Sequence, residues 1–209
     1  MGFTYGVCLN LQDKKCLVVG GGSVAERKII RLLEEKAVVT VVSPQLTANL
    51  QELQKQFMWV EDTYQESYLA DSFLVIAATN QRAINHEIAC YCHKHGKLVN
   101  VIDSLEESSF TVNSTVQRGD LLLTVSTGGA SPAMTKKIRQ QLEEQYGLEY
   151  AVILEMLKSL RAEAMEKITD EEKRRAFLQE LGQTDVEKIL QTETLENWEK
   201  RVRTCLSSY

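Results

Sequence analysis

The chain has 209 residues, 44% of them hydrophobic and 25% charged, which is the composition of a soluble globular protein. Its formal net charge of −5 argues against a general nucleic-acid binder, and no apolar run approaches the ~20 residues that span a bilayer. The N-terminus lacks the layout of a signal peptide, and the five cysteines form no CxxC pair. We therefore expect a cytoplasmic protein without disulfide bonds.

Short apolar runs alternate with helical patterns over the first hundred residues. Apolar runs predict strands, and residues spaced by three and four predict helices. The expected strands are 15–20, 38–42, 58–61, 73–78 and 98–102, and the expected helices are 24–36, 46–57 and 83–95. Strands without interrupting polar residues are typical of a parallel sheet covered on both faces. The order predicts an α/β fold with an N-terminal Rossmann-like parallel sheet.

The alternation stops near residue 110. Two further strands are expected at 110–115 and 121–126, and the turn signal Gly119-Asp120 between them predicts a hairpin or two adjacent strands. Ser131 and Pro132 suit the N-cap and first position of a helix that runs to about Tyr146. A small α+β segment therefore follows the Rossmann-like part.

The remainder of the chain is polar and helical. Gly147 suits the end of the preceding helix, capping-box patterns begin at Thr169 and Thr184, and Gly182 lies between them as a terminator. We expect three parts: a Rossmann domain over 1–112, a small region over 113–146 and a helical C-terminal region over 147–209.

The sharpest local motif is a glycine turn. Gly20-Gly21-Gly22-Ser23-Val24-Ala25 matches G-x-G-x-x-G/A, and a strand precedes it while a helix follows. The first glycine permits a tight turn, the third lets a pyrophosphate approach the backbone, and the final alanine lets the helix pack closely on the sheet. The helix start offers free N–H groups to phosphates. The motif predicts dinucleotide binding, and a tight turn without a ligand is the alternative.

The second expected strand ends differently from the usual fingerprint. Ser43-Pro44 stands where an Asp or Glu usually binds the ribose hydroxyls, and no Arg stands there to attract a 2′-phosphate. We expect NAD rather than NADP. Ala78, Thr79 and Asn80 follow the fourth strand and are expected to contact the nicotinamide half, while a helix N-cap at Thr79 or Asn80 is equally compatible.

Two residues are candidates for acid–base chemistry. Asp103 follows the strand at 98–102 and so lies at the carboxyl edge, where active sites form. Its alternative is an Asx-turn residue ahead of Ser104. His86 is a possible proton carrier near the cofactor edge, because imidazole titrates near neutrality. A helical histidine is more often surface or core filler.

Cys90, Cys92, His93 and His95 look like metal ligands at first sight. They lie in an expected helix, where residues i and i+2 face apart. Only His86 with Cys90, and Cys92 with His95, share a face. No metal site is expected.

A second glycine loop ends the strand at 121–126 and opens a helix. Ser126-Thr127-Gly128-Gly129 offers hydroxyl and N–H groups, which favour an anion. Basic side chains follow within two turns, at Lys136, Lys137 and Arg139. The loop is a candidate substrate site for a carboxylate-rich molecule, and ordinary helix capping is the alternative.

Five motifs occur in a fixed order along residues 1–146. They are CLVVGGGSVAERK at 16–28, VVSP at 41–44, IAAT at 76–79, NVID at 100–103 and STGGASPA at 126–133. With these motifs the chain resembles the precorrin-2 dehydrogenases of sirohaem synthesis, which are related to the N-terminal part of multifunctional sirohaem synthase.

The resemblance implies a fold, an assembly and a reaction. It implies a homodimer with 113–146 as dimerisation region, and an active site between the Rossmann domain and elements of the partner. It implies NAD-dependent oxidation of precorrin-2 to sirohydrochlorin, with Asp103 as acid/base group. It also implies that Ser126, Thr127, Gly128 and Gly129 line the tetrapyrrole site, with Thr127 where the family has serine.

Two other functions stay open. Some relatives also insert Fe²⁺ into sirohydrochlorin, and Asp103 and His86 are the residues we would suspect of helping. A non-catalytic NAD-sensing module is a less favoured alternative, because it would not need the second loop. The chain ends at Tyr209 without room for a methyltransferase domain, so we expect a separate methyltransferase to supply precorrin-2. A separate chelatase is the alternative to iron insertion by this chain.

Overall fold

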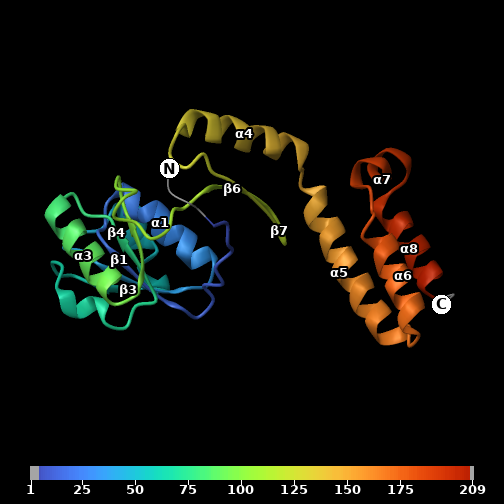
Figure 1. The fold of residues 1–209 in the computed structure, drawn as a ribbon, viewed down its shortest axis with the longest axis horizontal. Helices are drawn as coiled ribbons and strands as arrows, with labels where there is room; N and C mark the ends of the chain where they lie inside the picture. The colour runs from blue at the N-terminus through green and yellow to red at the C-terminus, as the bar shows by residue number, and fades with distance from the viewer. Residues whose placement is uncertain (1–4, 208–209) are drawn as a thin grey trace. The chain divides into compact units, whose positions relative to one another are not determined.

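The computed structural model describes residues 5–207 (Figure 1). They form two compact units, which divide after Val112. Each unit has its own sheet and its own hydrophobic core. Within the described residues, no helix is both long and apolar enough to cross a membrane.

The first unit is built on a five-stranded sheet with the order β3-β2-β1-β4-β5. All four strand pairs are parallel, which confirms the predicted doubly wound α/β fold. The elements are β1 (Lys15–Val19), α1 (Ser23–Glu34), β2 (Val38–Val42), α2 (Ala48–Glu52), β3 (Met58–Val60), β4 (Leu74–Ala77), α3 (Arg82–Lys94) and β5 (Leu98–Val101), with 3₁₀ turns at Gln54–Gln56 and Glu66–Leu69.

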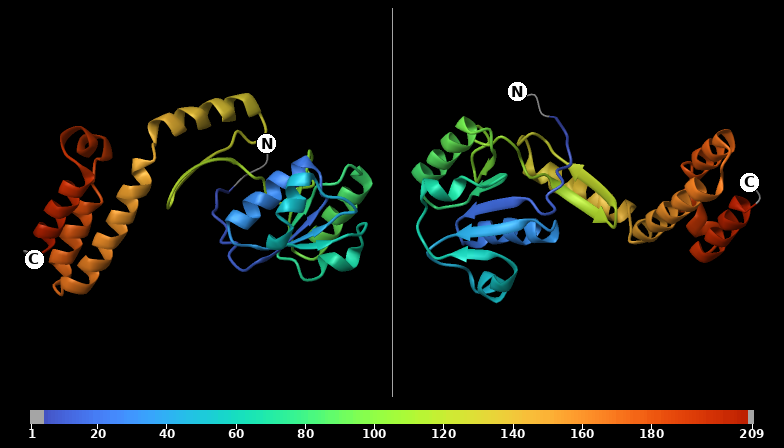
Figure 2. Two further views of the ribbon diagram at one scale, coloured as in Figure 1. Left: turned by 180° about the vertical axis from the view of Figure 1, so that it is seen from behind. Right: turned by 90° about the horizontal axis from the view of Figure 1, so that it is seen from below.

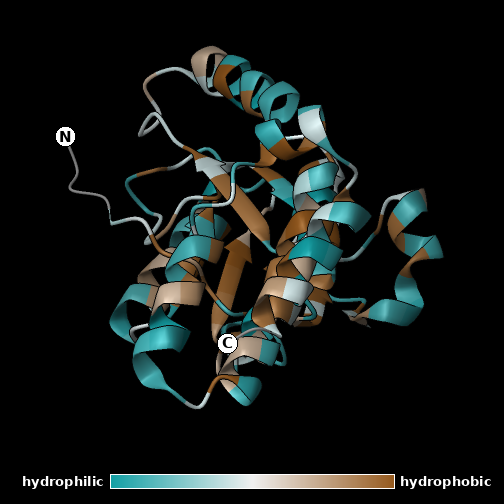
Figure 3. Cartoon of the chain, turned by 90° about the vertical axis from the view of Figure 1, so that its right-hand side faces the viewer, coloured by the Kyte–Doolittle hydropathy of each residue, from teal (hydrophilic) through white to brown (hydrophobic). Residues whose placement is uncertain are grey.

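Alternate residues of the central strand face two different cores. Cys16 and Val18 of β1 pack with Ile29 of α1 on one face of the sheet. Leu17 and Val19 pack with Ile88 of α3 and other residues on the opposite face. The sheet is therefore buried on both sides, and its strands are coloured mainly as hydrophobic in Figure 3, whereas the helices also carry hydrophilic residues.

The outer edge of β5 is covered by the loop that follows it. The Ser109 hydroxyl accepts a hydrogen bond from Val99 N at 2.8 Å, and the Ser108 hydroxyl accepts one from Val101 N at 2.9 Å. Phe110 then packs against the core on the α1 face. The predicted start of the strand at 110–115 was therefore wrong. The strand β6 begins at Ser114, because the residues before it cover the edge of β5.

The second unit begins with a two-stranded antiparallel hairpin, as Figure 2 shows in its right-hand view. Gly119 takes φ +57 in its two-residue turn, a conformation that such turns require. The prediction of a hairpin is confirmed. The elements are β6 (Ser114–Arg118), β7 (Leu121–Val125), α4 (Pro132–Gln145), α5 (Glu149–Lys167), α6 (Glu171–Leu181), α7 (Val186–Thr192) and α8 (Leu195–Leu206).

The C-terminal helices share a separate core. Leu160 of α5, Phe177 of α6 and Trp198 of α8 are almost fully buried against one another and against Ile189 of α7. This cluster explains why the polar tail folds: each helix contributes a few large apolar side chains and keeps its charged residues outside.

Several predicted helix ends were wrong. Asp170 and Asp185, rather than Thr169 and Thr184, cap α6 and α7, because their carboxylates accept bonds from Lys173 N and Lys188 N at 3.0 Å. Ser131 caps α4 as expected.

Two other expected features also differ. Gly147 is absent from the residues with positive φ, so it does not end α4 as a left-handed cap. The helix expected over 46–57 is only a short helix, Ala48–Glu52, followed by a 3₁₀ turn. Thr47 caps it, because its hydroxyl accepts a bond from Leu50 N at 3.3 Å.

Candidate functional site

The carboxyl ends of the parallel strands form one edge of the first unit. In the order β2, β1, β4 and β5, the residues that follow these strands are Ser43, Gly20, Ala78 and Ile102. Backbone bonds tie them together: Gly20 N donates to Val42 O at 2.9 Å, and Ile102 N donates to Ala77 O at 3.0 Å. The structure therefore brings the first glycine turn, Ser43-Pro44, residues 78–80 and Asp103 to one edge.

Two of the three glycines are required by close packing. Gly20 takes φ +124, and a Cβ there would lie 2.3 Å from Ala78 O. A Cβ on Gly21 would lie 2.1 Å from Gln45 O. No side chain fits at either position, so these glycines let the turn lie against the segments that follow β4 and β2.

Gly22 differs from its two neighbours. It is exposed, and a Cβ built on it meets no atom within 4 Å. It is the N-cap of α1, and no side chain caps this helix end. Ser23 and Val24, which follow, are exposed, while Ala25 is fully buried. Open space before uncapped N–H groups fits the pyrophosphate of a dinucleotide.

Ser43 is a buried rather than an open hydroxyl. It is 7% exposed, and its hydroxyl donates to Gln45 O at 2.7 Å. The Trp59 indole N–H donates to Ser43 O at 3.0 Å. Pro44 is exposed beside it. Ser43 thus fixes the path of the chain at the end of β2, and its oxygen has only its remaining lone pairs to offer a ribose hydroxyl.

Residues 78–80 form a hydrogen-bonded turn ahead of α3. The Thr79 hydroxyl lies 2.7 Å from Asn85 Oδ1 and also accepts a bond from Gln81 N at 3.1 Å. Asn85, which is buried, donates to Thr79 O at 3.0 Å. Gln81 occupies the N-cap position without a side-chain bond, so neither Thr79 nor Asn80 is the N-cap.

Asp103 stands in an unusual backbone conformation. It is exposed and takes φ +61, and Ser104 N donates to Val101 O across it at 3.3 Å. A positive φ at the third position of a turn is uncommon for residues other than glycine, and Asp adopts it more readily than most of them. Asp103 therefore lies in a backbone turn at the sheet edge, and its side chain is exposed there.

His86 lies on α3 with a partner at each ring nitrogen. Its Nδ1 is 2.5 Å from Glu107 Oε1, and its Nε2 is 3.5 Å from Cys90 Sγ. The bond from His86 holds the pKa of the Glu107 carboxyl below its ordinary value. Sequence reasoning missed Glu107, because it lies in the irregular loop after β5 and only the tertiary fold brings it to α3.

The second loop is stabilised by its own hydroxyl groups. The Thr127 hydroxyl accepts a bond from Ser131 N at 3.1 Å, and Ser126 Oγ accepts one from Gly128 N at 3.2 Å. Gly128 and Gly129 take φ +59 and +83 and are exposed. The hydroxyl groups therefore cap the loop and the start of α4, and Gly128 and Gly129 are its exposed glycines, with the Gly128 N–H already bonded.

The basic residues after this loop are not equivalent. Lys136 and Lys137 are exposed on α4, whereas Arg139 is paired with Glu143 one turn further on. Two lysines therefore supply the available positive charge beyond the loop.

Cys90, Cys92, His93 and His95 lie in different surroundings. Cys92 is fully buried, whereas Cys90 and His93 are exposed. His95 stacks on Tyr91 with ring centroids 4.0 Å apart. Over residues 5–207, no group of three His, Cys, Asp or Glu side chains is arranged to hold a metal ion.

Family comparison divides the chain within a few residues of the boundary between the two units. The family described as "Putative NAD(P)-binding" matches residues 7–114, and the family "Sirohaem biosynthesis protein central" matches residues 118–145. The first match contains the whole parallel sheet with its glycine turn. The second contains the turn of the hairpin, β7, the second glycine loop and α4.

Individual relatives extend over both units. The precorrin-2 dehydrogenase of Priestia megaterium is 32% identical over 198 residues, which is 85% of this chain and 98% of that protein. The siroheme synthase of Nitrosomonas eutropha is 34% identical over 86% of this chain, and the chain spans only 38% of its length. The solved structure of SirC, a precorrin-2 dehydrogenase, covers 99% of this chain with a TM-score of 0.81 and 28% identity.

Proposed function

This chain belongs to the precorrin-2 dehydrogenase family, and from that premise we propose that it oxidises precorrin-2 to sirohydrochlorin with NAD as hydride acceptor. The observation that carries the proposal is the match to a precorrin-2 dehydrogenase over 98% of that protein's length. The much longer siroheme synthases share only this portion, so their further activities are not part of the proposal.

The first unit would hold the dinucleotide at the carboxyl edge of its sheet. The open space at Gly22 and the N–H groups of Ser23 and Val24 would receive the pyrophosphate. Residues 78–80 would border the nicotinamide half. When bound, NAD supplies the electrophilic ring that takes up a hydride.

The end of β2 favours NAD over NADP. Ser43-Pro44 would lie beside the adenosine ribose, and no arginine follows within Gln45–Thr47 to bind a 2′-phosphate. The Ser43 hydroxyl has no charge, so it would bind a ribose hydroxyl through its remaining lone pairs.

Asp103 would act as the general base of the reaction. As a C–H bond of the macrocycle breaks and its hydride leaves, the macrocycle must also lose a proton. The exposed Asp103 carboxylate at the sheet edge would accept that proton. His86 remains a second candidate proton carrier, although both of its ring nitrogens already have partners in this unit.

The second glycine loop would bind the substrate. Precorrin-2 is rich in carboxylates, and the exposed Gly129 would offer its backbone N–H just before α4, whereas the Gly128 N–H is already bonded to Ser126 Oγ. Lys136 and Lys137 would add positive charge. Ser126 and Thr127 would act mainly by holding the loop in shape.

The second unit would also form a homodimer. A two-stranded sheet is marginal by itself, and this unit leaves Leu122, Met134 and Val152 well exposed. We place the dimerisation region at 113–146. The protein would work in the cytoplasm, where its thiols stay reduced, and a separate methyltransferase would supply precorrin-2.

Anaerobic turnover of precorrin-2 with NAD tests the proposal. Reduced nicotinamide should form in proportion to sirohydrochlorin, and NADP should support a much lower rate. Absence of reduced nicotinamide, with NAD binding retained, would contradict the proposal and favour an NAD-sensing module.

Addition of Fe²⁺ after the oxidation is complete tests for a second activity. Iron insertion no faster than the protein-free control indicates a dehydrogenase only, which would leave insertion to a separate chelatase. Faster insertion indicates a bifunctional enzyme.

A further inference from the structure

One cluster of reactive side chains in the first unit contains two residues, Cys90 and Glu107, that the proposed oxidation does not use. Cys90 and His86 lie one turn apart on α3, with Cys90 Sγ 3.5 Å from His86 Nε2. On the other side of the ring, Glu107 Oε1 lies 2.5 Å from His86 Nδ1. A thiol, an imidazole and a carboxylate therefore stand in line.

The carboxylate decides which nitrogen of His86 carries a proton. The hydrogen bond from His86 lowers the pKa of Glu107, so the carboxylate is charged at neutral pH and acts as an acceptor. Nδ1 is therefore the donor to Glu107, and in the singly protonated ring Nε2 is the acceptor that faces the Cys90 thiol.

The loop that carries Glu107 is held in place. His93 Nε2 lies 3.0 Å from Glu107 O, and Ser108 Oγ accepts from Val101 N at 2.9 Å while it donates to Ser104 O at 2.7 Å. Glu107 is thus positioned by the edge of the sheet and by α3. A nucleophile next to a base, with the base oriented by a third group, is the arrangement that activates a thiol.

Cys90 differs from Cys8, Cys16 and Cys92 in this respect. Cys16 and Cys92 are buried, and burial raises the pKa of each thiol to about 11, which makes both poor nucleophiles. Cys8 is exposed like Cys90, but among residues 5–207 no hydrogen bond joins it to a histidine. Exposure and an adjacent base coincide at Cys90.

We propose that Cys90 is a modification site, a thiol activated by His86 and Glu107 for exchange with low-molecular-weight disulfides such as glutathione disulfide. In the exchange, Cys90 Sγ forms a bond to one sulfur of the disulfide as the disulfide bond breaks. The Cys90 proton passes to His86 Nε2 and then to the departing thiolate. Cys90 is oxidised to a mixed disulfide, and one molecule of glutathione is released in its reduced form.

The test is a timed reaction of the full-length protein with glutathione disulfide, quenched by acid and followed by peptide mass spectrometry. Cys8 is the internal reference, because it reports an exposed thiol in the same molecule. Cys90 should react at least about tenfold faster than Cys8, a modest part of the ~10²–10⁴-fold that a positioned base contributes in enzymes. Dithiothreitol should reverse the adduct.

Two variants separate activation from simple exposure. His86→Asn should bring the Cys90 rate down to that of Cys8, and Glu107→Gln should lower it less, because the ring remains but loses its orientation. The buried Cys16 and Cys92 should stay unmodified in each variant, which shows that the fold is intact. Equal rates at Cys90 and Cys8 in the parent protein, or a fast rate at Cys90 that survives His86→Asn, would overturn the proposal. None of these readouts depends on precorrin-2.

Discussion

At the scale of single residues, the glycine turn shows three neighbours with different constraints. Gly20 and Gly21 are excluded from carrying side chains by the carbonyl groups of Ala78 and Gln45. Gly22 has no such neighbour, and its backbone is in the extended region that any residue adopts. Close packing therefore explains the first two glycines, whereas the third is explained by its N-cap position and by the proposed phosphate site.

This difference predicts opposite effects for two alanine variants. Gly22→Ala should keep the fold, at a cost below about 1 kcal/mol for a poorer N-cap, and weaken NAD binding by about tenfold or more. Gly20→Ala should destabilise the protein by at least the order of 1–3 kcal/mol, from its backbone conformation alone. Urea denaturation and NAD titration of each variant check this. Unchanged NAD affinity in a folded Gly22→Ala protein would count against the phosphate site.

The backbone of Asp103 determines which substitution tests its chemistry. Asparagine accepts the left-handed conformation almost as well as aspartate, whereas alanine adds a cost of about 1–2 kcal/mol. We expect Asp103→Asn to lower turnover of precorrin-2 by about 10²–10⁴-fold, because the proton acceptor is lost. NAD affinity should stay that of the parent protein, which is the control. Turnover within a few-fold of the parent protein would exclude Asp103 as the base.

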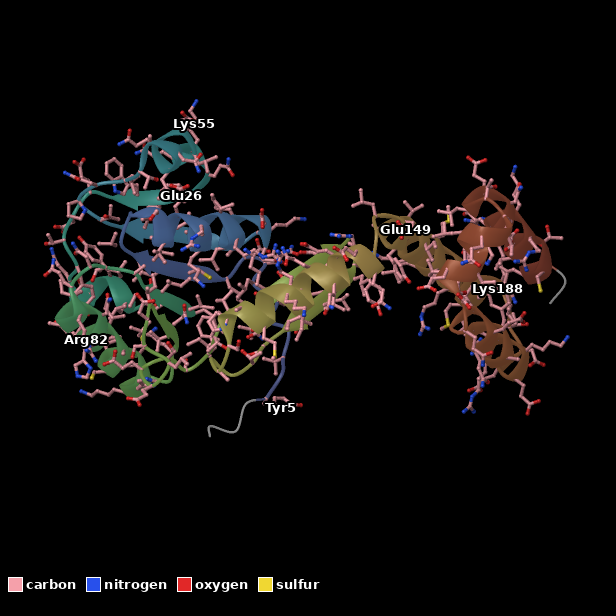
Figure 4. The ribbon with its side chains drawn as sticks, turned by 90° about the horizontal axis from the view of Figure 1, so that it is seen from above. Tyr5, Glu26, Lys55, Arg82, Glu149 and Lys188 are labelled. Carbon is pink, nitrogen blue, oxygen red and sulfur yellow. The ribbon has the colours of Figure 1, made fainter. Side chains whose placement is uncertain are left out.

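At the scale of elements, a carboxylate joins the helix after the glycine turn to the helix after β2. Glu26 projects from α1, where Figure 4 labels it, and accepts bonds from Thr47, the N-cap of α2, and from Asn49 Nδ2 at 2.9 Å. These bonds lower the pKa of Glu26 below its ordinary value of 4.5, with the bond from Thr47 as the largest cause. The charged form is the one that the folded state favours.

The sign of this shift predicts an acid-dependent contribution to stability. The contribution is present above the ordinary value of 4.5 and is lost as the pH falls through the lower pKa of the folded state. Glu26→Gln should therefore lower the urea midpoint at neutral pH, and the difference from the parent protein should shrink below pH 4.5. Glu52→Gln, an exposed carboxylate on α2, is the matched control and should leave the midpoint unchanged. A difference that grows toward low pH would contradict the assignment.

The same scale shows what local patterns could predict. The strands and helices of the sheet could be predicted from apolar runs such as 38–42 and 98–102 and from the helical spacing of Ala25, Ile29 and Leu32. These patterns show which side chains must be buried, whatever the order of the strands in the sheet. The side-chain bonds that cover the edge of β5 could not be predicted from the sequence. Ser108 and Ser109 make these bonds, and β6 therefore begins later than the predicted strand. Thr169 and Asp170 are neighbours and both are suitable N-cap residues, so the sequence alone does not show which of them begins α6.

Some residues of the candidate site could likewise be predicted from local patterns, and others could not. The glycine turn, Ser43, residues 78–80 and Asp103 were predicted, because each follows a strand whose carboxyl end defines the edge. The distances between His86, Cys90 and Glu107 were not, since a helix and a separate loop bring them together. The spacing of His86 and Cys90 indicated a shared helix face, and Glu107 had no signal of its own.

At the scale of the whole molecule, two units with separate cores imply separable properties. The first unit contains every residue proposed to contact NAD, and the second contains the proposed dimerisation region. A fragment of residues 1–112 should therefore fold, bind NAD with an affinity close to that of the full chain, and sediment as a monomer. The full chain should sediment as a dimer. Circular dichroism, NAD titration and analytical ultracentrifugation check these outcomes, and a folded fragment that fails to bind NAD would contradict the division of roles.

The central place of β1 in the sheet has a consequence for how the protein is made. Its neighbour β2 follows soon after it along the chain, but its other neighbour, β4, is synthesised only after α2 and β3. The contact of Gly20 with Ala78 forms only when β4 has joined the sheet. Pairing between distant segments is the slow part of folding. A nascent chain thus carries the complete glycine motif long before it has a binding site. During refolding, the rate at which dinucleotide affinity appears would measure the rate at which β4 pairs with β1.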